Sequence, residues 1–207
     1  MNLKRLFRLF MGIFLYAVGI VLSVQANIGV APWDAFHQGL AGITSMTFGQ
    51  ASIVVGLVIL IINYTMDIKI GFGTIVNAVG IGYIIDIFMY NDIIPVSTNP
   101  IISVLMIIGG MFLIAFASYF YIGAGLGAGP RDGLMVGLVK KTNKRVGVVR
   151  SSIELTVLLI GFILGGQIGI GTLLLAIGIG PIMQFTFKWL SFSVEDVKHD
   201  YLLSKEV

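Results

Sequence analysis

The chain has 207 residues, of which 57% are hydrophobic and only 11% are charged, with a formal net charge of +3. A soluble domain carries roughly 25% charged residues, because its surface faces water. The mean hydropathy of +1.00 therefore excludes a soluble globular domain and predicts a chain that folds in lipid.

The absence of cysteine excludes disulfides, thiolate catalysis and cysteine-ligated metals. The basic residues lie at predicted helix ends without interleaved aromatic residues, which excludes nucleic-acid binding. The first apolar run imitates a signal peptide that ends in Val24-Gln25-Ala26. Residues 11–28 have a counterpart at 109–126, however, deep inside the chain, so we expect a retained first membrane helix.

The sequence matches itself without a gap when it is shifted by 98 residues. The matched residues are mainly glycine, proline, aspartate and threonine, which have special backbone roles, whereas chance would align leucines and isoleucines. The clearest pairs are Gly29 with Gly127, Pro32 with Pro130, Asp34 with Asp132, Gly71 with Gly169, Thr74 with Thr172, and Gly80 with Gly178. We predict a single membrane domain with two homologous halves, residues 9–90 and 101–190, followed by a cytoplasmic tail, 191–207.

The sequence predicts the same elements in each half, in chain order. These are a long apolar helix, a glycine-rich break, a short helix that begins with proline, and two more long apolar helices. The predicted ranges are 9–27, 32–43, 48–65 and 72–90 in the first half and 101–124, 130–141, 146–165 and 171–190 in the second. The long helices can cross roughly 30 Å of hydrocarbon at 1.5 Å per residue. The short helices cannot, so we expect them to be re-entrant or interfacial.

Lysine and arginine concentrate in cytoplasmic loops and set the orientation. With six spans, the basic N-terminus, Lys69 and the basic residues of 140–145 fall on one side of the membrane, whereas 91–100 and 165–169, which lack Lys and Arg, fall on the other. Three spans in each half place equivalent loops on opposite sides. We therefore predict an all-α protein built from two inverted three-helix repeats, with both termini in the cytoplasm.

Small residues recur every four positions from residue 125 to residue 137, a spacing that permits close helix packing. Transporters with inverted repeats also use broken helices to bind substrate near the midplane. On this ground we expect packing and helix-break roles for Gly29, Pro32, Gly125, Gly127, Gly129, Pro130, Gly133 and Gly137. The Gly-x-Gly-Thr segments at 71–74 and 169–172 are not nucleotide loops, because no strand precedes them and no lysine follows. They predict entry turns to the third and sixth spans.

Polar residues in a membrane span are costly and usually face the protein interior. The candidates for a substrate site or pathway are Asp34, His37, Asn77, Arg131, Asp132, Arg150, Glu154 and Gln184. We expect the two aspartates to cap their short helices, and His37 to be an interfacial polar residue rather than a proton carrier. No second histidine lies in the membrane region, so no metal site is predicted.

The roles of Arg131 and Glu154 each leave two alternatives open. Arg131 has no charged counterpart in the first half. We expect it either to form an ion pair with Asp132 or Glu154, or to bind an anionic lipid or substrate. Arg150 and Glu154, four residues apart, share one face of the fifth span. Because the counterpart of Glu154 is Gly56, the scaffold does not need this carboxylate, which either lines a pathway or completes a buried ion pair.

The Gly-x-x-Pro-x-Asp segments, repeated together with the Ile-Gly-x-Gly-Thr segments, resemble the YczE/YyaS/YitT group of bacterial integral membrane proteins, and the YczE-like members most closely. The resemblance covers roughly residues 9–190 and is most specific at 125–133. It implies a small multi-pass protein of the bacterial cytoplasmic membrane, and it supplies no catalytic residue and no cofactor.

The architecture predicts transport of a small solute or amphiphile through a site between the inverted halves, an analogy at the level of the fold. The alternative is a non-transporting accessory protein that supports a partner complex or a biosynthetic pathway. An enzyme is not expected, because the sequence shows no nucleophile–base pair and no metal constellation. The expected partners are membrane lipids, a small-molecule substrate, and a second copy or another membrane protein.

Overall fold

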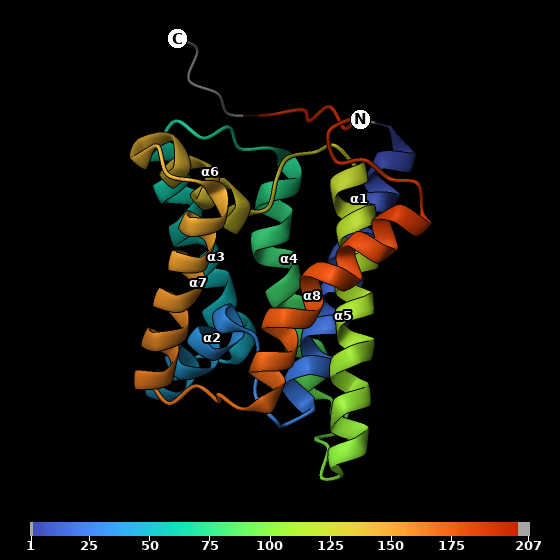
Figure 1. The fold of residues 1–207 in the computed structure, drawn as a ribbon, viewed down its shortest axis with the longest axis vertical. Coiled ribbons are helices and arrows are strands. Elements are labelled where there is room, and N and C mark those ends of the chain that lie inside the picture. The colour runs from blue at the N-terminus through green and yellow to red at the C-terminus, as the bar shows by residue number, and fades with distance from the viewer. Residues whose placement is uncertain (1, 203–207) are drawn as a thin grey trace.

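The computed structural model describes residues 2–202, which form eight α-helices and no strand (Figure 1). The helices are α1 (Leu3–Gln25), α2 (Pro32–Ile43), α3 (Phe48–Thr65), α4 (Phe72–Tyr90), α5 (Pro100–Gly123), α6 (Pro130–Thr142), α7 (Val146–Ile163) and α8 (Ile170–Trp189). All except α2 and α6 are long and apolar enough to cross a membrane. The last residues of the predicted tail, 203–207, lie outside the described part of the chain.

The helix bounds agree with the predicted ranges to within two residues, except that α1 begins at Leu3 instead of residue 9. The apolar run that predicts this helix begins after the basic residues Lys4, Arg5 and Arg8, whereas the observed helix includes them. In the structure the side chain of Asn2 caps α1 by accepting a hydrogen bond from the backbone N–H of Lys4, at 3.2 Å. The Arg5 and Arg8 side chains then bind backbone carbonyls of residues 123–125, near the end of α5. Such bonds satisfy carbonyls that have no partner inside the helix.

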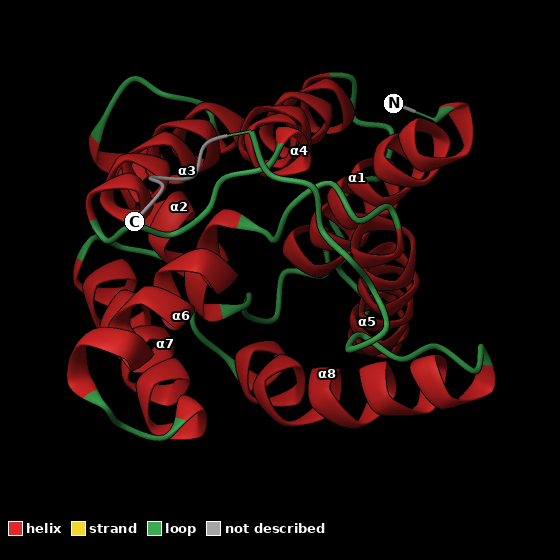
Figure 2. Cartoon of the chain, turned by 90° about the horizontal axis from the view of Figure 1, so that it is seen from above, coloured by secondary structure: helices red, strands yellow, loops and turns green. Residues whose placement is uncertain are grey.

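The two short helices lie near opposite ends of the bundle, and each packs against both α3 and α7 (Figure 1). Viewed along the bundle, α3, α6 and α7 group on one side and α1 and α5 on the other, with α4 and α8 between them (Figure 2). The α1–α5 contact is the most extensive in the molecule, and it joins the first span of each half.

Two equivalent backbone contacts lock the break of one half against the other half. The N–H of Gly171, at the start of α8, donates to the carbonyl of Ile28 in the break after α1, with an N···O distance of 2.7 Å. The N–H of Gly73, at the start of α4, donates to the carbonyl of Leu126 in the break after α5, also at 2.7 Å. We call these contacts the glycine clasps; residues 28–29 meet 169–171 in one, and 126–127 meet 71–73 in the other.

Only glycine suits the centre of each clasp. Gly29 has a φ of +108° and Gly127 a φ of +115°, in the region that L side chains rarely adopt. A Cβ on Gly29 would also lie 2.8 Å from the Cα of Gly169, and a Cβ on Gly127 would lie 2.7 Å from the Cα of Gly71. The Gly-x-Gly-Thr segments are thus helix entries, as predicted, and they are in addition the surfaces on which the breaks dock.

Close packing of α6 is confirmed for part of its predicted glycine face. A Cβ on Gly133 would lie 2.6 Å from the side-chain nitrogen of Asn63, and Gly137 faces Met66. The buried Asn63 side chain donates to the Pro130 carbonyl at 2.8 Å and so fixes the start of α6 on α3. Gly129 does not pack in this way, because the one side chain that its Cβ would meet is Asp132. Gly125 precedes the helix and lies under the C-terminal tail.

The described part of the tail runs back over the break after α5. Arg5 forms an ion pair with Asp200, and the Arg5 Nε donates to the Ala124 carbonyl at 2.7 Å. The N–H of Gly127 donates to Nδ1 of His199 at 3.2 Å. Only the break of the second half is covered in this way.

We predict that Gly127→Ala destabilises the protein, because it places a side chain at a positive φ and against the backbone of Gly71. Overpacking costs about 1–3 kcal/mol, so thermal unfolding in detergent should shift clearly to a lower temperature. The matched control is Gly147→Ala in α7, where a Cβ meets nothing within 4 Å. Its melting temperature should stay the same or rise slightly. Equal melting temperatures of the two variants would contradict the clasp.

We also predict that the tail docks less tightly at acidic pH. Burial and the nearby Arg5 guanidinium lower the pKa of His199, so the docked state favours the neutral ring that accepts the Gly127 hydrogen bond. Docking is therefore strongest above the ordinary histidine pKa of about 6.5, and it weakens as pH falls through that value. A spin label at Leu202→Cys, the sole cysteine of that variant, should be more mobile at pH 5.5 than at pH 7.5. In His199→Phe the label should be mobile at both values; an unchanged pH response would exclude His199 as its cause.

Candidate functional site

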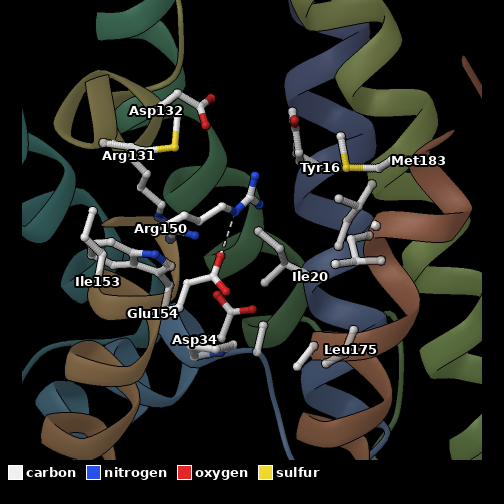
Figure 3. A pocket seen from close by; sticks show the side chains of 18 of the residues that line it. Tyr16, Ile20, Asp34, Arg131, Asp132, Arg150, Ile153, Glu154, Leu175 and Met183 are labelled. Atoms are coloured by element: carbon white, nitrogen blue, oxygen red, sulfur yellow. Dashed lines mark hydrogen bonds and ion pairs between the residues drawn. The ribbon is translucent and has the colours of Figure 1, made fainter. Parts of the chain in front are cut away.

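A cavity of about 550 Å³ lies where the two halves meet, lined by α1, α2, α5, α6, α7 and α8 (Figure 3). Its charged side chains are Asp34 at the start of α2, Arg131 and Asp132 at the start of α6, and Arg150 and Glu154 on α7. The facing wall is largely apolar and comes from α1, α5 and α8, with Ile20, Leu175 and Met183 among its residues (Figure 3).

A second cavity of about 190 Å³ adjoins the first and shares Tyr16, Ile20, Arg131 and Asp132 with it. His37 and Asn77 line the second cavity, and Gln184 lines the first. All eight polar candidates predicted from the sequence therefore line one or both of these cavities, although they come from five different helices.

The two cavities occupy equivalent places in the two halves. Val55, Gly56, Ala78 and Ile81 line the second cavity, and the residues 98 positions later line the first: Ile153, Glu154, Ala176 and Ile179. The main chemical difference is charge, because Glu154 replaces Gly56 and Arg150 replaces Ser52. The larger cavity is also the more charged one.

Arg150 and Glu154 form an ion pair, with the Arg150 Nε donating to Oε1 of Glu154 at 3.0 Å. The ion pair that the sequence left as one alternative is therefore present, but it is not buried, because the two side chains are 58% and 38% exposed. The residues pair and line the cavity at the same time, and the two alternatives raised by the sequence are not exclusive.

Arg131 is half-buried, and its guanidinium lies over the ring of Trp33, 4.8 Å from the ring centroid. Within residues 2–202 it forms no ion pair, so the alternative of a pair with Asp132 or Glu154 is not found, and the alternative of an anionic lipid or substrate stays open. Stacking on an indole stabilises a cation while leaving its N–H groups free. Asp132 is exposed at the cavity and is likewise unpaired in the described part of the chain.

The predicted capping by Asp34 and Asp132 is also wrong. Ala31 and Gly129 occupy the N-cap positions, and neither short helix has a side-chain capping bond. Both aspartates stay in the first turn, where a negative charge complements the helix dipole. Both carboxylates line the cavity (Figure 3), and Oδ2 of Asp132 also lies 3.2 Å from where a Cβ of Gly129 would be.

His37 is 1% exposed, and the prediction that it is interfacial is wrong. Its imidazole ring extends from α2 toward α3 and packs edge-on against the ring of Phe48, with 5.8 Å between the ring centroids. Nδ1 is 3.8 Å from Oδ1 of Asp34, and among the described residues neither ring nitrogen has a hydrogen-bond partner. The apolar neighbours come from tertiary packing, which the local sequence around His37 did not indicate.

Tyr16 and Trp33 were missed by the sequence analysis. Tyr16 lies between the two cavities, and its hydroxyl is 2.6 Å from Oγ of Ser118 on α5. Its counterpart in the second half is Ile114, which is apolar. A polar residue in a span whose counterpart is apolar could have marked Tyr16 as a site residue, in the same way that the Gly56 counterpart marked Glu154. Trp33 supplies the ring on which Arg131 stacks. In residues 2–202 no group of three His, Asp or Glu side chains could hold a metal ion.

Comparison with known proteins places the chain among membrane proteins. Residues 3–188 match the model of a family described as "Family of unknown function (DUF6198)". The chain belongs to this family. Six apolar helices and relatives that include a named membrane protein identify a multi-pass membrane protein in contact with lipid.

Relatives from two bacteria are similar to this chain over most of their length. The "Uncharacterized membrane protein YczE" of Bacillus subtilis is 39% identical over 181 residues, covering 86% of this chain and 82% of the relative. An "Uncharacterized protein" of Haemophilus influenzae is 34% identical over 178 residues, covering 84% and 81%. The "Uncharacterized protein YyaS" of B. subtilis is 29% identical over 167 residues, covering 79% and 82%. The family resemblance drawn from the motifs is thereby confirmed. No solved structure matches the chain.

We predict that Glu154→Gln changes stability little, because the Arg150–Glu154 pair is exposed at the cavity. Exposed ion pairs contribute about 0–1 kcal/mol, whereas breaking a buried pair costs about 3–5 kcal/mol. The thermal stability of Glu154→Gln, Arg150→Gln and the double variant should therefore stay near that of the unchanged protein. Asn63→Ala serves as a comparison, since it removes a buried hydrogen bond and should be clearly less stable. A loss for Glu154→Gln as large as for Asn63→Ala would show that the pair is structural.

Proposed function

We propose that this protein is a membrane transporter that moves a small solute or amphiphile through the cavity between two inverted repeats. The observation that carries the proposal is the convergence of five charged side chains from both halves on one cavity within the bundle. Charged residues at membrane depth usually mark substrate or ion pathways, and sites between inverted repeats commonly use the starts of broken helices. The proposal requires binding and conformational change but no catalysis.

The arrangement of the helices supports the inverted repeat. Each half runs through a span, a short helix and two more spans, and three spans reverse the direction of the second half. The short helices lie near opposite ends of the bundle (Figure 1). Matching backbone conformations occur at equivalent positions, with positive φ at Asn27 and Gly125, at Gly29 and Gly127, and at Asp67 and Gly165.

The charge distribution supports an orientation with both ends of the chain in the cytoplasm of a bacterial cell. The end of the bundle that holds the start of α1 also holds the end of α6, with Lys140 and Lys141 in its last turn. Basic residues favour the cytoplasmic side. The match to relatives from two bacteria supports the bacterial cytoplasmic membrane.

Alternating access of the cavity tests the transport proposal, and the chain is suited to it because it contains no cysteine. Single cysteines at Ile153 and Met183, on facing walls, should react with a membrane-impermeant thiol reagent from each side of sealed vesicles. A transporter must expose its site to both sides in turn. Ile107→Cys, which is fully buried, should react from neither side.

Two exposed positions serve as orientation controls: Ser45→Cys should react from the outside only, and Thr142→Cys from the cytoplasmic side only. Reaction of the cavity cysteines from one side alone would contradict transport and would favour the non-transporting accessory role.

A further inference from the structure

The two halves differ at one pair of helices. In the first half α3 packs along α4, and the N–H of Gly49 at the start of α3 donates to Oδ1 of Asp86 at 2.8 Å. A Cβ on Gly82 would lie 2.7 Å from the Ile53 side chain, so the helices approach at their glycines. The equivalent helices α7 and α8 do not pack along each other in this way. A Cβ on either of the corresponding glycines, Gly147 and Gly180, would meet nothing within 4 Å.

In the first half, small residues allow α3 and α4 to pack closely. The residues at the equivalent positions of α7 and α8 line the larger cavity instead. A Cβ on Gly56 would lie 3.2 Å from the Cβ of Ala78, and the counterparts of these two residues are Glu154 and Ala176. The counterpart of Asp86 is Gln184, which also lines the cavity. Ile153 and Glu154 of α7 lie on one side of the cavity, and Leu175 and Met183 of α8 on the other (Figure 3). The cavity thus lies between α7 and α8, which lack the extensive packing that joins α3 and α4.

The outer faces of these two helices are strongly apolar, as a lipid-facing surface is. Leu155 and Leu159 of α7 and Leu173 and Ile177 of α8 are each more than half exposed. An opening between two such helices leads from hydrocarbon directly to charged groups. A molecule that enters by this route has an apolar part that stays in lipid and a polar part that reaches the charges.

The charges at the cavity specify the polar part. Arg131 is an unpaired cation held over the Trp33 ring, and the adjacent Asp132 is an unpaired, exposed carboxylate within the described chain. A guanidinium binds phosphate oxygens with two parallel hydrogen bonds, and a carboxylate accepts hydrogen bonds from an ammonium group. Arg150 and Glu154 already neutralise each other, which leaves Arg131, Asp132 and the buried Asp34 as the remaining charged side chains of the cavity. Of the two carboxylates, that of Asp132 is the exposed one and is therefore accessible to a ligand.

We propose that the cavity binds the headgroup of a zwitterionic phospholipid that carries a phosphate and a primary ammonium group, and that this lipid enters from the bilayer between α7 and α8. The phosphate lies at Arg131 and the ammonium at Asp132, while the acyl chains stay in the opening against α8. A cavity of about 550 Å³ accommodates the headgroup without the chains, since ligand sites hold drug-sized molecules in about 300–1,000 Å³. This lipid is the substrate class of the transporter proposed above. Its movement across the membrane rests on that proposed function, whereas its binding is tested separately.

Native mass spectrometry of the full-length protein, purified in detergent and mixed with equal amounts of phosphatidylethanolamine, phosphatidylcholine and phosphatidylglycerol, tests the binding. We expect one phosphatidylethanolamine to be retained in preference to the other two lipids. Arg131→Gln and Asp132→Asn should each lower that retention by at least about tenfold, the effect of about 1.4 kcal/mol. Gly180→Trp fills the opening and should also abolish retention.

The matched control for Gly180→Trp is Gly109→Trp on α5, which makes the same change at a glycine that also faces open space but does not line the cavity. Its lipid retention should equal that of the unchanged protein, and melting temperatures verify that each variant is folded. If Gly180→Trp does not fold, the two headgroup variants decide the outcome. Equal retention of all three lipids, preference for the choline or glycerol headgroup, or full retention by folded Arg131→Gln and Asp132→Asn variants overturns the proposal.

The outcomes of the two experiments are separable. Failure to retain the lipid, together with cysteines at Ile153 and Met183 that react from both sides, overturns the lipid inference and leaves transport of another solute. Selective retention without reaction from both sides supports the lipid site and contradicts transport.

Discussion

The glycine clasps are the contacts on which the rest of this structure depends. In each, the backbone after the first span of one half lies directly against the start of the last span of the other half, with a hydrogen bond of 2.7 Å. This approach leaves no room for a Cβ, and it requires a positive φ at Gly29 and Gly127. Because each clasp stops a long helix and redirects the chain, the short helix that follows starts inside the bundle. The first residues of α2 and α6 consequently reach one shared cavity.

The cavity resolves the energetic problem that charges cause in a membrane. A charged side chain at the centre of a bilayer costs about 2.5–3.5 kcal/mol on insertion scales, and more when it is isolated. Here the charged side chains of the site gather at one cavity within the bundle. Arg150 pairs with Glu154, Arg131 lies over an indole ring, and the aspartates lie in the first turns of the short helices. The facing wall is largely apolar, so the site combines a charged surface with an apolar one.

The two halves differ in how their last two helices pack, and the difference has a physical reason. Helices in lipid associate through small residues that allow close van der Waals contact, and α3 and α4 meet in this way around Gly56 and Ala78. A glutamate at the position of Gly56 cannot make that contact, because its carboxylate would be buried against a helix without a partner. Glu154 therefore favours separation of α7 from α8. The described residues of the tail add a second asymmetry, since they cover the break after α5 and not the break after α1.

The sequence by itself determined the number of helices, their bounds apart from the start of α1, the repeat at an offset of 98 residues, and eight of the polar residues that line the cavities, although not Tyr16. These features follow from local physical signals: apolar length for the spans, proline and glycine for the breaks, and the rarity of polar groups in lipid. Only the tertiary structure decided which helices face one another. It buried His37 against Phe48, left both aspartates at the cavity without a capping bond, placed Arg131 over Trp33, and separated α7 from α8. Such contacts join residues that are distant in the chain, and no local pattern encodes the partner across a helix interface.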